Sequence, residues 1–233
     1  MRANETGPFQ LDGQIYTVGE LQLLAEDSNA DPALLLSLAL RREWWPQNHI
    51  IAICFGDERL GVFERLASNP SVPIHGLIQL AREHILRIMK NPTFRLHALA
   101  DLSVIDRLEC GEKRRAVERG GEECAFLMRY LARDKNALLA YRVGAANNPC
   151  CPEDLLRVFV RRHQAPVRSA VVSNPRLPAD LQEPLAVDRV ESIRFLLAYR
   201  TDLLPKTVQT LLDTGGPWVR EALDENPTIS LAG

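Results

Sequence analysis

Residues 148–152 of the chain read NPCCP, and residues 174–178, which follow 26 positions later, read NPRLP. Each proline removes a backbone N–H, and the first proline of each motif also keeps the preceding asparagine out of the α-helical region. An Asn-Pro step therefore ends a helix, whereas the second proline suits the first turn of a new helix, where its missing N–H has no partner. The motif predicts a junction between two short helices.

This junction recurs through much of the chain. In the C-terminal half the asparagine position returns every 26 residues, and in the N-terminal half it returns at intervals of 22, 29 and 28 residues. Asparagine suits the position because its side chain can hydrogen-bond to the backbone of the turn. We predict that five asparagines hold equivalent structural positions, with Gly120 and Arg200 at the two remaining steps: Asn69, Asn91, Asn148, Asn174 and Asn226.

Two helical patterns lie between successive junctions. In each pattern apolar residues recur at i, i+3 and i+4, which places them on one face of a helix. Helices of roughly ten residues are marginal alone in water, so the units must stack their apolar faces on one another. We therefore predict an all-α fold of stacked two-helix units. The predicted core triplets are Leu155, Val158 and Phe159; Val167, Ala170 and Val171; Ile193, Leu196 and Leu197; Val208, Leu211 and Leu212; and Val219, Ala222 and Leu223.

The unit that begins at Asn174 has a proline inside its first helical pattern. Pro184 lies where a backbone N–H would bond back one turn. We therefore predict that this helix is short, bent or partly 3₁₀.

The stretch NPRLPADLQEPLAVDRVESIRFLLAY at 174–199 resembles the leucine-rich repeat variant family, with Asn-Pro-x-x-Pro and Leu-Ala-x-Asp elements in order and Ile193-Arg194 in place of the family's Val-Arg element. LAED at 24–27 and LARD at 131–134 are similar to the Leu-Ala-x-Asp element. The resemblance implies a right-handed α-solenoid, related to HEAT-type solenoids, of two-helix repeats of 22 to 29 residues that alternate α-helices with short 3₁₀-like helices. Some members carry an N-terminal iron–sulfur cysteine cluster. Here the first cysteine is Cys54 and no cluster follows, so no such cofactor is expected.

The repeats define the expected domain organisation. We expect a diverged helical cap region at 1–61 and the repeats at 62–233, in one continuous domain. The tryptophan pair in RREWWPQNHI, Trp44 and Trp45, fits a cap that closes the N-terminal end, because terminal units need a distinct outer face. The alternative is that one tryptophan anchors a partner, since tryptophan is enriched at binding hot spots.

No catalytic or metal-binding pattern is readable in the chain. HExxH, GxSxG, Walker A and GxGxxG motifs are absent, the five histidines are scattered, and the five cysteines include no CxxC pair. Cys151 aligns with Val72, Leu177 and Leu204, which is an apolar core position, so we interpret it as a small buried residue. We expect a non-enzymatic protein without cofactors or metals.

Six residues are candidates for binding a partner. Trp218 lies outside the apolar pattern, which favours an exposed anchor and a homodimer through the C-terminal end. One arginine recurs in the second helix of five units, where it could capture acidic groups of a partner. The alternative is a role within the fold, with pairing to a carboxylate such as Asp188 or Asp213. The arginines of this column are Arg114, Arg142, Arg168, Arg194 and Arg220.

Charge and the absence of targeting signals limit the functional classes. The 28 basic and 30 acidic residues leave a net charge of −2, and residues 140–226 carry eleven of each sign. This balance disfavours the alternative of a nucleic-acid-binding or base-excising solenoid. MRANETGPFQ at the N-terminus shows no secretory signal, and no apolar run is long enough to span a membrane. We expect a cytoplasmic scaffold that presents an extended surface to another protein.

Overall fold

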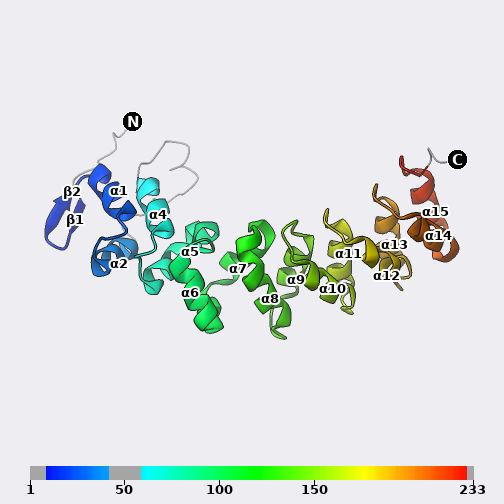
Figure 1. Cartoon of the computed structure of the whole chain (residues 1–233), viewed down its shortest axis with the longest axis horizontal. Coiled ribbons are helices and arrows are strands. Elements are labelled where there is room, and N and C mark those ends of the chain that lie inside the picture. The colour runs from blue at the N-terminus through cyan, green and yellow to red at the C-terminus, as the bar shows by residue number, and fades with distance from the viewer. Residues whose placement is uncertain (1–8, 42–58, 230–233) are drawn as a thin grey trace. The chain divides into compact units, whose positions relative to one another are not determined.

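The computed structural model describes residues 9–41 and 59–229, and it is mainly helical, which confirms the all-α class (Figure 1). The tryptophan pair Trp44 and Trp45, and also Cys54, lie outside the described residues. The chain divides into two compact units, residues 1–116 and residues 117–233. Each unit is built from helices that pack on their neighbours in sequence.

The first unit opens with a β-hairpin, whereas the sequence predicts a helical region there. The strands β1 (Phe9–Leu11) and β2 (Gln14–Tyr16) pair antiparallel. Asp12 and Gly13 make the turn with positive φ angles of 47° and 82°, a conformation that Asp-Gly favours in two-residue hairpin loops. The helices that follow are α1 (Val18–Glu26), α2 (Pro32–Leu40), α4 (Arg59–Ser68), α5 (Ile74–Ile88), α6 (Pro92–Ala100) and the 3₁₀ helix η2 (Leu102–Arg107).

Two features distinguish the first unit from the regular repeats: the position of the expected domain boundary and the shorter interval between its asparagines. The boundary expected between residues 61 and 62 falls inside α4. Asn69 and Asn91 are only 22 residues apart, so no room remains for a loop between two helices. The two helices are instead merged into α5, which is bent at His84, where φ is −118° and ψ is 28°.

The second unit contains the regular repeats. In Figure 1, α9, α11, α13 and α15 form one layer, in which each helix packs on the next, while α10, α12 and α14 lie in the other layer. Helix α7 (Cys110–Arg119) spans the division between the units. The other elements are η3 (Glu122–Cys124), α8 (Ala125–Arg133), α9 (Leu139–Asn147), α10 (Glu153–Val160), α11 (Ala165–Ser173), η4 (Ala179–Leu181), α12 (Gln182–Ala186), α13 (Glu191–Ala198), α14 (Pro205–Thr214) and α15 (Pro217–Asp224).

Most of the residues in the predicted apolar triplets are buried. In the second helix of each regular repeat, the first and last residues of the predicted triplet are buried, as Val167 and Val171 show. The first helices bury a face rotated from the prediction: in α10 Leu156 is buried and Val158 is 45% exposed. Two further residues that the pattern wrongly places in the core are exposed, Leu196 and Leu212.

The prediction for Pro184 is confirmed. The first helix of that unit starts as the 3₁₀ helix η4 and continues as α12, which is only 5 residues long. The missing N–H of Pro184 and the clash of its ring with the preceding turn explain why a longer regular helix does not form.

Each of the five predicted asparagines joins its own two-helix repeat to the preceding repeat. The Nδ2 group of Asn174 donates to the carbonyl oxygens of Ala146 at 2.7 Å and Asn148 at 2.8 Å, and its Oδ1 accepts the Arg176 N–H at 2.8 Å. The two carbonyls lie at the C-terminal end of the preceding second helix, where backbone oxygens lack partners within the helix. Equivalent bonds are made by Asn69, Asn91, Asn148 and Asn226; we call these five asparagines and Arg200 the ladder residues.

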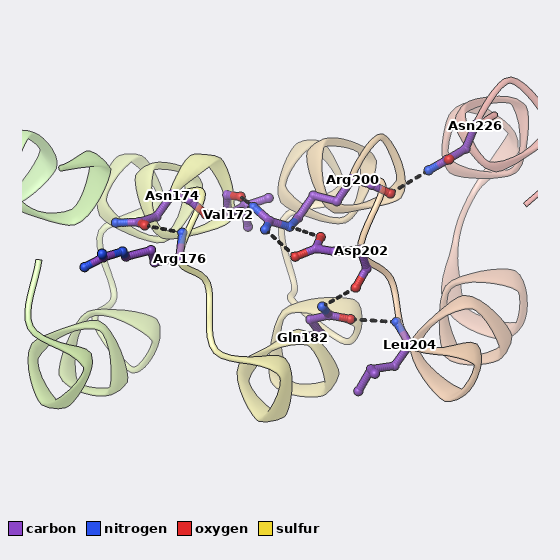
Figure 2. A network of polar contacts seen from close by, with 8 residues as sticks. All are labelled: Val172, Asn174, Arg176, Gln182, Arg200, Asp202, Leu204 and Asn226. Atoms are coloured by element: carbon purple, nitrogen blue, oxygen red, sulfur yellow. Dashed lines mark hydrogen bonds and ion pairs between the residues drawn. The ribbon is translucent and has the colours of Figure 1, made fainter. Parts of the chain in front are cut away.

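Arg200 performs the same task with a different side chain (Figure 2). Its Nη1 donates to the carbonyl oxygens of Val172 at 2.6 Å and Asn174 at 2.9 Å. Its remaining donors, Nε and Nη2, bind the carboxylate of Asp202. Gln182 then fixes this turn, because its amide donates to the Asp202 carbonyl and accepts the Leu204 N–H. An arginine therefore replaces an asparagine without loss of the contact between units.

The ladder gives a first testable prediction. Replacing Asn148 by Ala leaves the Val117 and Gly120 carbonyls and the Cys150 N–H without their partner, at a site where Asn148 is 3% exposed. We expect a loss of about 2–4 kcal/mol in the free energy of unfolding, measured by urea denaturation. The neighbouring Asn147 is exposed, so Asn147→Ala is the matched control. Equal effects of the two substitutions would contradict the role of the ladder.

Candidate interaction surfaces

Two of the five arginines in the column are buried, and four of the five bond to the backbone of their own repeat. Arg142 and Arg168 are buried, at 7% and 5% exposure, so their guanidinium groups do not reach the surface. In four members the guanidinium donates to a backbone carbonyl that lies six or eight residues earlier, near the end of the first helix of the same unit. These bonds run from Arg142 to Asp134, from Arg168 to Arg162, from Arg194 to Asp188 and from Arg220 to Leu212. Arg114 and Arg220 are exposed.

Arg168 also forms a buried ion pair with Asp188 of the following two-helix repeat. Its Nε and Nη2 bind the Asp188 carboxylate at 2.6 and 2.9 Å. Burial raises the pKa of Asp188, but the hydrogen bonds from Arg168 and from the Val190 N–H outweigh burial, and the pKa lies below its usual range. The sequence predicted Asp188 as a partner for this column, and the pair links successive units.

The Asp188 ion pair predicts a pH dependence of stability. Because the folded-state pKa is lowered, the pair stabilises the fold at pH values above the unfolded-state pKa, and this contribution is lost as the pH falls through the folded-state value. Asp188→Asn should therefore cost about 3–5 kcal/mol at neutral pH, since it leaves a buried guanidinium without its countercharge. The difference from the parent protein should shrink in denaturation curves recorded below about pH 4.

A surface ion pair provides the control for this experiment. Asp154 binds Arg129 at 2.8 Å, but the Asp154 side chain is 65% exposed. Asp154→Asn should cost at most about 1 kcal/mol at any pH. A similar cost for the two substitutions at neutral pH would show that the Asp188 pair is not effectively buried.

In the second unit, charged side chains of the first helices form ion pairs between successive repeats. Arg129 binds Asp154, Arg157 binds Asp180, and Lys206 binds Glu183 at 3.3 Å. In the first unit, ion pairs join Arg65 to Glu26 and Arg87 to Glu64, but α1 and α4 end at ladder positions and are therefore second helices. In the second unit the paired groups neutralise one another along the layer of first helices.

The second helices expose a surface of a different kind. Arg142 and Arg168 are the only charged residues of α9 and α11, and both are buried. Three equivalent outward positions of α9, α11 and α13 hold small, aliphatic, neutral polar and aromatic residues, whereas α13 also carries the exposed Glu191. We call this the second-helix face; it consists of Ala140, Val143, Asn147, Pro166, Ser169, Ser173, Ser192, Phe195 and Tyr199.

Aromatic side chains gather toward the C-terminal side of the second-helix face. The rings of Phe195 and Tyr199 meet edge to face, with centroids 5.0 Å apart. The Tyr199 hydroxyl donates to the Glu225 carboxylate at 2.9 Å, which holds the ring in place. Trp218 on the next second helix is 65% exposed, in agreement with its position outside the apolar pattern.

The four cysteines of the described residues differ in burial. Cys151 is 7% exposed, and burial raises the pKa of its thiol to about 12. Cys124 is buried as well, whereas Cys110 is exposed. Within 9–41 and 59–229, no three His, Cys, Asp or Glu side chains come together as a metal site would require.

The environment of Cys151 predicts its reactivity. A thiol with a pKa of about 12 is almost entirely protonated at pH 8, and burial also hinders access. Iodoacetamide should therefore modify Cys110 in the folded protein and leave Cys151 unmodified until urea is added, as measured by peptide mass spectrometry. Modification of Cys151 at the rate of Cys110 without denaturant would show that its surroundings open readily.

Comparisons with protein-family models, with curated proteins and with solved structures find no match to this chain. None of the helices in the described part of the chain is long and apolar enough to cross a membrane. A function for this chain is therefore inferred from its geometry. Sequence reasoning missed the second-helix face, although the lack of exposed charge in 139–147 and 165–173 was a readable signal.

Proposed function

We propose that this chain is a non-enzymatic scaffold that binds another protein through the second-helix face. The observation that carries the proposal is the contrast in exposed charge between the second helices α9 and α11 and the first helices of the same unit. The first helices hold paired charges in water, whereas α9 and α11 expose no charged side chain. Interface centres are depleted in charged residues and enriched in aromatic ones, which fits the second-helix face and Trp218.

The proposal includes the finer features that the sequence suggests. The repeats would form a right-handed α-solenoid of the leucine-rich repeat variant kind, and the protein would act in the cytoplasm. A stack of this type offers one extended surface, because each unit repeats the same outward positions. The partner is then a protein segment that can cover several units at once.

Nucleic-acid binding has less support as a function. Such a role requires basic side chains that are free to contact phosphates. Arg129 and Arg157 are paired with carboxylates, and Arg142 and Arg168 are buried. The second-helix face offers no exposed base on α9 or α11.

A pair of lysine substitutions tests the proposed face. Asn147 and Ser173 are exposed at equivalent positions of α9 and α11, so Asn147→Lys with Ser173→Lys adds two charges one unit apart. The matched control places lysines at two exposed positions on the other layer, Val158 and Val187. We expect all variants to melt within a few degrees of the parent, because surface changes of this kind alter stability by only about 0.5 kcal/mol.

The readout is binding to a partner that is captured with the parent chain, identified, purified and titrated by calorimetry. We expect the face variant to weaken this binding at least about tenfold, through the cost of burying two unpaired charges, and the control variant to leave it unchanged. Binding to a labelled DNA duplex is measured as the test of the alternative function, because added lysines strengthen nucleic-acid binding. Tighter DNA binding by the face variant, with no effect on the protein partner, would refute the proposal.

A further inference from the structure

The three outward rows of the second-helix face continue onto α15, where the type of side chain changes. Successive repeats are offset by 26 residues, and this offset relates Ser192 of α13 to Trp218 of α15. It likewise relates Phe195 to Glu221 and Tyr199 to Glu225. The face therefore passes from small and neutral residues on α11 to aromatic rings and then to carboxylates. We call its last part the C-terminal patch; it consists of Phe195, Tyr199, Trp218, Glu221 and Glu225.

The patch lies on the outward side of its helices, and the packing of repeats on one another does not cover this side. Tyr199 is 45% exposed and Phe195 is half-buried, although α15 packs against their helix. Pro166 and Ser192, at the positions equivalent to Trp218, are exposed with a following repeat in place. The exposure of the patch therefore follows from the repeat itself.

Within the patch, an aromatic ring and two carboxylates act on one another. The Tyr199 hydroxyl donates to the Glu225 carboxylate at 2.9 Å, from one repeat to the next. This hydrogen bond raises the pKa of Tyr199, and the negative charges of Glu225 and Glu221 raise it further. The face of an aromatic ring attracts a cation, and neighbouring carboxylates add to that attraction. The patch therefore has the chemistry of a site for a cationic side chain.

The last turn of α15 carries negative charge that the fold does not balance. Glu221, Asp224 and Glu225 lie in this turn or directly after it, and the turn contains no basic residue. Acidic groups near a helix C-terminus and like charges four residues apart both destabilise a helix. Within residues 9–41 and 59–229 these carboxylates form no ion pair, because Arg194 and Arg220 donate to backbone carbonyls of their own repeats. A cation supplied by a partner would offset this repulsion.

We propose that the C-terminal patch binds an arginine or lysine side chain of the protein segment that lies along the second-helix face. The cation pairs with the carboxylates of Glu221 and Glu225 and contacts the ring of Trp218, which is one turn before Glu221 on α15. The neighbouring residues of the segment are small or apolar, and they cover α11 and α9, which expose no charge. The proposal rests on the proposed function and specifies the chemistry of its partner.

A fluorescein-labelled peptide of four Gly-Ser-Arg repeats serves as the probe, and the same peptide with citrulline in place of arginine is its uncharged match. Fluorescence anisotropy should show saturable binding of the arginine peptide alone to the full-length protein. Glu221→Gln with Glu225→Gln should weaken this binding about threefold to tenfold, because two exposed ion pairs are lost. Trp218→Leu should weaken it about threefold without any change in net charge.

The matched control removes two exposed carboxylates outside the patch, through Glu122→Gln with Asp213→Asn, and should leave the binding unchanged. The proposal is overturned if the control loses as much affinity as Glu221→Gln with Glu225→Gln, because the attraction would then come from net charge. It is also overturned if neither the patch variant nor Trp218→Leu weakens the binding. A dimer of the parent protein in light scattering that the patch variant dissociates would overturn it as well, because a second copy would then be the occupant.

The purified protein partner distinguishes this proposal from the proposed function. Suppose that Asn147→Lys with Ser173→Lys weakens partner binding, whereas Glu221→Gln with Glu225→Gln does not. The proposed function would then be supported and the present proposal overturned. If the arginine peptide binds as expected and the lysine substitutions leave partner binding unchanged, the proposed function is refuted and the patch is retained as the site for a basic segment.

Discussion

The contact that the structure depends on is the hydrogen bonding of each ladder side chain to two carbonyls of the preceding repeat. A helix end leaves its last carbonyls without partners, and burying them unpaired is costly. In this chain Asn174 reaches back to Ala146 and Asn148 and also closes its own turn. One residue thus donates hydrogen bonds to the last carbonyls of the preceding second helix and ends its own helix. It also sets the spacing between successive repeats.

This constraint determines what the other side chains are free to do. Because the ladder residues and the Arg168–Asp188 pair connect the units internally, the first helices need only solvated ion pairs such as that of Arg129 with Asp154. The second helices α9 and α11 expose no charged side chain and present small and neutral polar residues instead.

The sequence predicted the helix junctions and the ladder positions because proline and asparagine act locally on the backbone. It also predicted the short helix at Pro184 and the buried Cys151. It could not predict the rotation of the buried face that exposes Val158, because stacking between units decides which side of a short helix is covered. The burial of Arg168 was missed for a similar reason, since its partner Asp188 belongs to the next unit.

The central claim is that the ladder side chains are bonded between units throughout the folded state. Hydrogen exchange of the asparagine side-chain amides, followed by NMR, tests it most directly. The amides of Asn148, Asn174 and Asn226 should exchange only when the second unit unfolds, while the amide of the exposed Asn147 exchanges freely. Exchange of the three ladder amides at the rate of Asn147 would contradict the account.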